Sequence, residues 1–321
     1  MKEIDEKVLY DLGISRRVER GQSAPITNCY HFCSDGAKAE VLFRCHDDYV
    51  YAMNRLAVLV QEHDVLLLAF CLMDNHFHVV LYGLEEACRD FIREFVRCLG
   101  IALSKRGGDE AIADVSAVSF KSITDSLYLK TVICYVLRNP PVGHLAYSAW
   151  FYPYSSCSLL FPSSLQGCEW CAPRWMDMSQ SESLCDLSYE QRRMIGRGAE
   201  KVPRNWRAMD GMILPSHYVA ASLVEKIYVT PRAYHYFMSS CRDKDMDEQM
   251  GSFSSLSIPD KEMRVHRDTL LKGLFPGQTL RQLSVSERVS LARKLKSQYG
   301  CPPKQIARLV GLPAPQLDRL L

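Results

Sequence analysis

Residues 64–83, DVLLLAFCLMDNHFHVVLYG, constrain the fold more than any other stretch of this chain. Two apolar segments, DVLLLAFCL and HFHVVLYG, flank the turn-like residues Met73, Asp74 and Asn75. Short apolar runs on both sides of a polar turn are typical of a β-hairpin. Because polar residues and histidines interrupt this longest apolar stretch, we expect no membrane-spanning segment.

Strand-like and helix-like patterns alternate on both sides of this hairpin. The order strand, helix, strand, strand, helix, strand is typical of the ferredoxin-like or RRM-like arrangement, an antiparallel sheet with helices on one face. The sequence therefore predicts an α+β fold. Outside the hairpin, the predicted elements are a strand at 26–34, a helix at 47–63, a helix at 85–107, a strand at 116–123, and a helix at 125–139 that Pro140 and Pro141 end.

The chain divides into three regions by composition. Residues 22–162 hold the alternating elements and form the first predicted domain. Residues 163–280 have weaker patterns and are predicted to be a helical spacer, with an exposed loop near 242–257. Residues 281–321 contain three short helical patterns with glycines between them, which is typical of a helix-turn-helix.

Positive charge is concentrated at the end of the chain. The whole chain of 321 residues carries a formal net charge of only +2. From Lys261 onward there are twelve lysines and arginines against four acids, a net charge of +8. Such a segment suits contacts with nucleic-acid phosphates.

Cysteine use and the first residues of the sequence predict a cytoplasmic protein. The thirteen cysteines are scattered among helical and strand patterns and form no regular framework. The opening MKEIDEKVLYDLG is charged and has no apolar run like that of a signal peptide. We therefore expect reduced thiols and a cytoplasmic location.

Two histidines one residue apart give the strongest chemical signal. Alternate side chains of a strand share a face, so His76 and His78 project together and are able to hold a divalent cation. In the helix at 125–139, Tyr135 and Asn139 lie one turn apart and bring a phenol and an amide oxygen to one side. Each feature also has a structural explanation: polar alternation for the histidines, a half-buried aromatic for Tyr135, and a helix-end residue before proline for Asn139.

The combination resembles a known family, the REP-associated tyrosine transposases within the HUH single-strand DNA transposases and nucleases. The resemblance covers about residues 22–160. It rests on FCLMDNHFHVVLYG, on FKSITDSLYLKTVICYVLRNPP and on FYPYSS at 151–156. The segment LARKLKSQYGCPPKQIARLVGL also looks like the helix-turn-helix tail of some bacterial members.

This resemblance implies a reaction and a role for each residue. His76, His78 and Asn139 would bind Mg²⁺ or Mn²⁺, and Tyr135 would attack a DNA phosphodiester. The product would be a 5′-phosphotyrosine with a free 3′-OH, resolved by a second strand transfer in DNA transposition. Tyr128 is the rival nucleophile, but the residue four positions later is Val132, which has no group to coordinate the ion.

The expected partner is single-stranded or hairpin DNA, with no membrane, and a homodimer is compatible with the resemblance. The residues that we expect to contact DNA are basic: Lys121 and Arg138 near the predicted site, and Lys304, Arg308 and Arg319 in the C-terminal module.

Two segments depart from the family pattern. The chain reads HFCSDGAK where members commonly have an Arg-Gly-Asn turn, and PVGH where they have Val-Arg-Ala after the Asn-Pro. One alternative is therefore a domesticated DNA-binding regulator that keeps the fold without strand transfer. Another is an RRM-like RNA binder, which would need aromatic side chains on the sheet where this chain has histidines.

Overall fold

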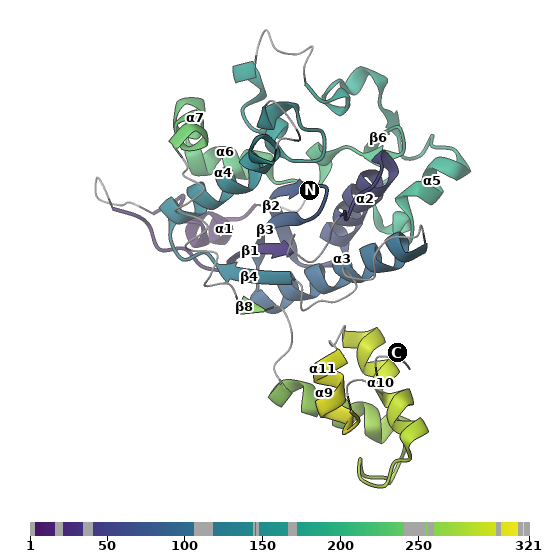
Figure 1. Cartoon of the computed structure of the whole chain (residues 1–321). Helices are drawn as coiled ribbons and strands as arrows, with labels where there is room; N and C mark the ends of the chain where they lie inside the picture. Colours follow the sequence, from purple (N-terminus) through teal and green to yellow (C-terminus); the bar gives the residue numbers. More distant parts are fainter. Residues whose placement is uncertain are drawn as a thin grey trace.

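The structure is a computed structural model that describes residues 4–16, 22–34, 41–105, 118–143, 145, 148–165, 172–240, 254–255, 260–299, 303–313 and 317. It is a mixed α+β structure built around an antiparallel sheet (Figure 1), which confirms the predicted fold class at that level.

The sheet has the strand order β2-β3-β1-β4-β8, and every neighbouring pair is antiparallel. The predicted hairpin is present as β2 and β3. In the register of the central strands, Cys33 lies opposite His78 and His31 lies opposite Lys121. The strands are β1 (Cys29–Ser34), β2 (Val65–Leu72), β3 (Phe77–Gly83), β4 (Val118–Ser122) and β8 (Ser254–Ser255).

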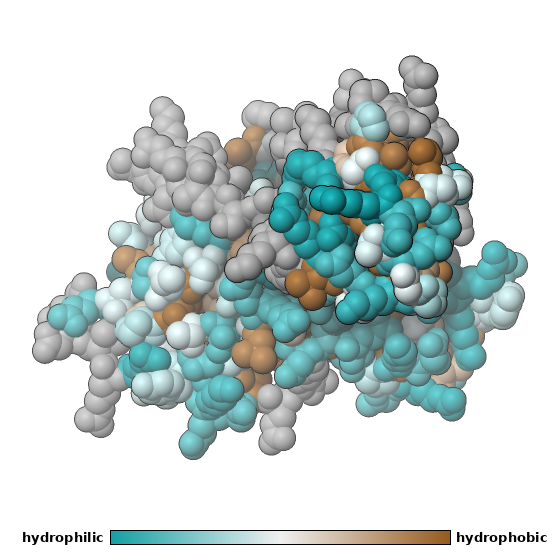
Figure 2. Space-filling view, turned by 90° about the horizontal axis from the view of Figure 1, so that it is seen from below, coloured by the Kyte–Doolittle hydropathy of each residue, from teal (hydrophilic) through white to brown (hydrophobic). Residues whose placement is uncertain are grey.

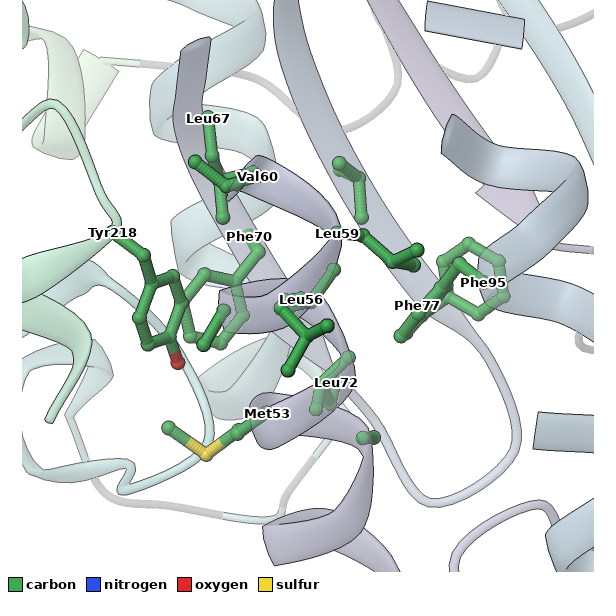
Figure 3. Packing of buried hydrophobic residues seen from close by; sticks show 14 of the residues in the cluster. Met53, Leu56, Leu59, Val60, Leu67, Phe70, Leu72, Phe77, Phe95 and Tyr218 are labelled. Atoms are coloured by element: carbon green, nitrogen blue, oxygen red, sulfur yellow. The ribbon is translucent and has the colours of Figure 1, made fainter. Parts of the chain in front are cut away.

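Helices α2 (His46–Glu62) and α3 (Glu85–Lys105) pack on one face of the sheet. Acidic residues in the first turn of each helix favour its start at that position. Figure 3 shows the packing, in which side chains of α2 lie against β2, β3, α3 and the aromatic ring of Tyr218. The labelled residues are Met53, Leu56, Leu59, Val60, Leu67, Phe70, Leu72, Phe77, Phe95 and Tyr218.

Helix α4 (Ser126–Val142) packs on the opposite face of the sheet. Asp125 caps its N-terminus by accepting hydrogen bonds from the backbone N–H groups of Leu127 and Tyr128. The same hydrophobic cluster includes α1 (Glu6–Asp11), α6 (Ala221–Tyr228) and α7 (Pro231–Ser240). The sheet is therefore covered on both faces, which corrects the prediction of helices on one face, because α4 packs on the face opposite α2 and α3.

The prediction that Pro140 and Pro141 end this helix is wrong, because α4 continues through both to Val142. Proline has no N–H, so Pro140 leaves the carbonyl of Val136 without its helical partner. The side-chain amide of Asn139 donates to that carbonyl at 3.4 Å and to the carbonyl of Tyr135 at 3.0 Å. The side chain thus replaces a backbone hydrogen bond that proline cannot make.

The region predicted to be a spacer contributes to both cores. Residues from Trp175 to Val219 join the cluster around α2, and Ala220 to Met238 join the cluster around α4. Asn54 of α2 binds the backbone of Gly211 and Ile213. Further elements here are α5 (Tyr189–Ile195) and the small sheet of β5 (Glu182–Ser183), β6 (Arg207–Met209) and β7 (Met212–Ile213).

Short 3₁₀ helices connect these elements. They lie at Ala149–Phe151, Cys157–Leu159, Pro162–Leu165, Arg174–Met176, Met178–Gln180, Ala199–Lys201 and Pro215–His217.

The C-terminal helices form a hydrophobic core of their own. It is built by α9 (Asp260–Leu274), α10 (Val285–Tyr299) and α11 (Pro303–Val310), so α9 belongs with the module that we predicted to begin at 281. Gly311 follows α11 with a φ of +68°, a conformation that favours glycine. Of the predicted loop at 242–257, only the residues of β8 are among those described.

Hydrophilic residues make up most of the coloured face in Figure 2, and the apolar residues there are in small separate groups. None of the helices in the described ranges combines the length and the apolar character that crossing a membrane requires.

Candidate active site

His76 and His78 lie on the side of the sheet that faces α4. His78 belongs to β3 and is 1% exposed, whereas His76 immediately precedes the strand and is partly buried. Their ring centroids are 4.9 Å apart and the rings are nearly perpendicular. The alternation predicted from the sequence therefore brings both imidazoles together beneath one helix.

Several contacts fix the hairpin turn that carries His76. The hydroxyl of Tyr152 donates to the carbonyl of Leu72 at 2.6 Å, and the N–H of Leu72 donates to the carbonyl of Tyr154 at 3.0 Å. The N–H of Phe43 donates to the carbonyl of Asp74 at 2.9 Å. The FYPYSS motif thus supports the turn beside the histidines.

Asn139 connects α4 to both histidines. Because its amide nitrogen donates to the carbonyls of Tyr135 and Val136, its carbonyl oxygen is left for other partners. The side chain of Asn139 interacts with His76 and His78, and in each case this interaction counteracts part of the loss of basicity caused by burial. The helix therefore brings the side chain of Asn139 close to both imidazoles.

Tyr135 completes the predicted group of four side chains. It is 9% exposed, and its ring lies edge-on to the ring of His78 with centroids 5.5 Å apart. The rival Tyr128 lies two turns earlier, and burial together with the charge of Asp125 raises its pKa to about 12. Lys121 lies over the Tyr128 ring, with its ammonium nitrogen 5.1 Å from the centroid.

Burial keeps both predicted histidine ligands neutral. It lowers the pKa of His76, and it lowers the pKa of His78 well below the usual value, with further lowering from the neighbouring His76 and His31. The Nδ1 of His76 lies 2.6 Å from the Oδ1 of Asn75, an acceptor that favours the tautomer with the proton on Nδ1 and the lone pair on Nε2. A neutral imidazole is the form that binds metal ions.

The donor set fits a divalent cation. Two neutral imidazoles and one amide oxygen leave coordination positions open for water and phosphate. In the described residues, no group of three or more His, Cys, Asp or Glu side chains is arranged to hold a metal ion. A site here would therefore depend on Asn139 as its third protein ligand.

His31 and Cys33 of β1 also reach this site, although neither was predicted from the sequence. His31 is fully buried, and its Nε2 lies 3.1 Å from the Nδ1 of His78. Burial, together with the charge of Lys121, lowers the pKa of His31 to about 3. The Sγ of Cys33 lies 3.9 Å from the Nε2 of His78. The alternation of Cys29, His31 and Cys33 along the strand was a signal for a shared face.

The five predicted DNA contacts are not all at one place. Lys121 and Arg138 are partly buried on β4 and α4. Arg308 of α11 is paired with Asp260, at 2.9 and 3.1 Å between side-chain nitrogens and oxygens. The side chain of Lys304 and the whole of Arg319 lie outside the described residues.

Comparison of the chain with protein-family models, with curated proteins and with solved structures finds no match.

Proposed function

We propose that the protein is an HUH-type tyrosine transposase or endonuclease that nicks and rejoins single-stranded or hairpin DNA. The observation that carries the proposal is the meeting of His76, His78 and Asn139 beside the ring of Tyr135. The two histidines come from β3 and the turn before it and the other two residues from α4, so this arrangement does not follow from closeness in the sequence.

The fold supports the proposal. The strand order β2-β3-β1-β4, with α2 and α3 on one face, is the order that a ferredoxin-like arrangement requires. Helix α4 covers the other face and carries Tyr135 and Asn139 toward the histidines. Because helices cover both faces, the described part of the sheet presents no open aromatic platform of the kind an RRM uses, which argues against the RNA-binding alternative.

The bound cation, Mg²⁺ or Mn²⁺, would be held by His76, His78 and Asn139 and would supply positive charge to polarise a phosphate oxygen. The hydroxyl oxygen of Tyr135 attacks the phosphorus and loses its proton to water. A new bond forms between that oxygen and phosphorus, the bond from phosphorus to the 3′ oxygen breaks, and the leaving 3′ oxygen takes up a proton. Because Tyr135 then holds the 5′-phosphate covalently, the strand is able to rejoin.

Basic side chains would bind the substrate around this centre. Lys121, which lies opposite His31 in the sheet, and Arg138, which precedes Asn139 in α4, would contact the DNA backbone. The basic C-terminal helices would add affinity or choice of DNA site. Their net charge of +8 from Lys261 onward suits that role.

A covalent-adduct assay tests the reaction type and the nucleophile together. We expect the protein with Mn²⁺ and hairpin DNA to give an adduct that resists SDS. Tyr135→Phe abolishes this adduct, while the matched control Tyr128→Phe retains it.

Loss of the adduct in Tyr128→Phe with retention in Tyr135→Phe would show that the nucleophile is misassigned. Salt-dependent DNA binding with no adduct from the unmodified protein would instead favour the alternative of a domesticated regulator.

A further inference from the structure

We infer that His31 is a positioning residue for the cation ligand His78: its Nε2 accepts the Nδ1–H of His78 and so directs the Nε2 lone pair of His78 to the ion. This inference rests on the proposed function, because it concerns the same cation site. His31 belongs to neither the two-histidine motif nor the tyrosine helix.

The register of the sheet brings the two rings together. His31 lies opposite Val80, two residues from His78 along β3, and diagonal neighbours on one sheet face are within reach of aromatic side chains. The rings of His31 and His78 are stacked, with centroids 5.2 Å apart and an angle of 25° between their planes. The two facing nitrogens are 3.1 Å apart, which is hydrogen-bonding distance.

The chemistry of imidazole gives this contact a direction when a cation is bound. A neutral imidazole has one N–H and one lone pair, and the hydrogen bond at one nitrogen decides which nitrogen can bind a metal. A cation at the Nε2 of His78 requires the proton to be on Nδ1. That N–H then needs an acceptor, and the Nε2 of His31 lies at the right distance.

Burial makes this acceptor hard to replace. His31 is 0% exposed and His78 is 1% exposed, so solvent does not substitute for the missing partner. Without an acceptor, the Nδ1–H of His78 is left unsatisfied or the proton moves to Nε2, and both outcomes weaken ion binding. Partners of this kind affect metal affinity by about 10- to 100-fold.

The test measures Mn²⁺ affinity directly, from the electron paramagnetic resonance signal of the free ion, on the full chain without DNA. We expect His31→Leu, which removes the acceptor, to weaken affinity about 10-fold or more. His31→Gln, whose side-chain oxygen accepts a hydrogen bond near the position of Nε2, is expected to stay within about threefold of the unmodified protein. A purely structural role would not favour the polar variant at a fully buried position.

A second measurement needs no variant. With Mg²⁺ bound, ¹⁵N NMR of labelled histidines should show His78 protonated on Nδ1. Protonation on Nε2 overturns the inference, and so does equal affinity of His31→Leu and His31→Gln. His78→Ala separates the two proposals: if it abolishes Mn²⁺ binding while His31→Leu does not weaken it, only the role of His31 fails. If the unmodified protein binds no Mn²⁺, the cation site itself fails.

Discussion

At the scale of single residues, burial rather than nearby charge sets the state of the candidate ligands. His31 and His78 are enclosed between the sheet and α4, and His76 is partly enclosed at the turn. Removal from water disfavours the protonated imidazole and lowers the pKa of all three. Their lone pairs are therefore available at neutral pH.

This burial predicts how stability depends on pH. Since the pKa of each histidine is lower in the folded state than in the unfolded state, the unfolded chain binds more protons below about pH 6.5. The stability that the neutral histidines contribute should therefore be fully present above that pH. At lower pH, the free energy of unfolding should fall by at most about 1.4 kcal/mol per pH unit for each histidine.

Urea unfolding at pH 7.5 and pH 5.5, without added metal, checks this expectation. A variant with His31→Gln and His78→Gln is the control, because it lacks two of the groups and should lose less stability on acidification. A decline in this variant equal to that of the unmodified chain would contradict the argument.

Sequence spacing was sufficient to predict four of the residues that lie together at the candidate site. His76 and His78 are separated by one strand period, and Tyr135 and Asn139 by about one helical turn, so each pair shares a face without knowledge of the fold. His31 could not be found in this way. Its contact with His78 depends on β1 pairing with β3 in a particular register, which is a non-local property.

At the scale of elements, the strands and helices of the first region were predictable because their patterns are long and periodic. The hairpin of β2 and β3 and helices α2 and α3 have bounds close to those predicted. The end of α4 was mispredicted because a side chain, not the backbone, provides the hydrogen bond that proline removes.

That hydrogen bond leads to a prediction for Pro140→Ala. Alanine restores a backbone N–H for the carbonyl of Val136, so the amide of Asn139 loses one of the two contacts that orient it. One hydrogen bond contributes about 1 kcal/mol. We therefore expect the affinity for Mn²⁺ to fall roughly fivefold.

Pro141→Ala is the matched control, because the carbonyl that it would satisfy belongs to Leu137, for which Asn139 is not a donor. Equal affinities of the two variants in a Mn²⁺ titration would show that Pro140 does not orient the ligand.

At the scale of the whole molecule, the region at 163–280 was the least predictable. Its 3₁₀ helices and two- or three-residue strands are too short for periodicity to be informative. Their placement depends on contacts with α2, such as those of Arg55 with the carbonyls of Ile195 and Arg197, which are distant in the sequence. Local patterns do not contain that information.

Helix α4 is enclosed by other elements of the same chain, and this bears on whether one chain or two chains form the site. Beyond the sheet, the hydroxyl of Tyr228 donates to the carbonyl of Lys130 at 2.7 Å, and the Sγ of Cys134 lies 3.1 Å from the same hydroxyl. Exchange of α4 with a second copy of the chain would expose the hydrophobic residues that pack on both sides of the helix. Tyr135 and the histidines meet within one copy of the chain, and we expect them to act within one polypeptide.

Mixing two inactive variants tests whether one chain forms the whole site. Tyr135→Phe supplies intact histidines and His78→Ala supplies an intact nucleophile, so any shared centre would regain adduct formation in the mixture. We expect no complementation, and recovery of the adduct would contradict assembly within one chain. For the unmodified protein, the fraction of molecules that react per minute at saturating DNA should stay constant on serial dilution.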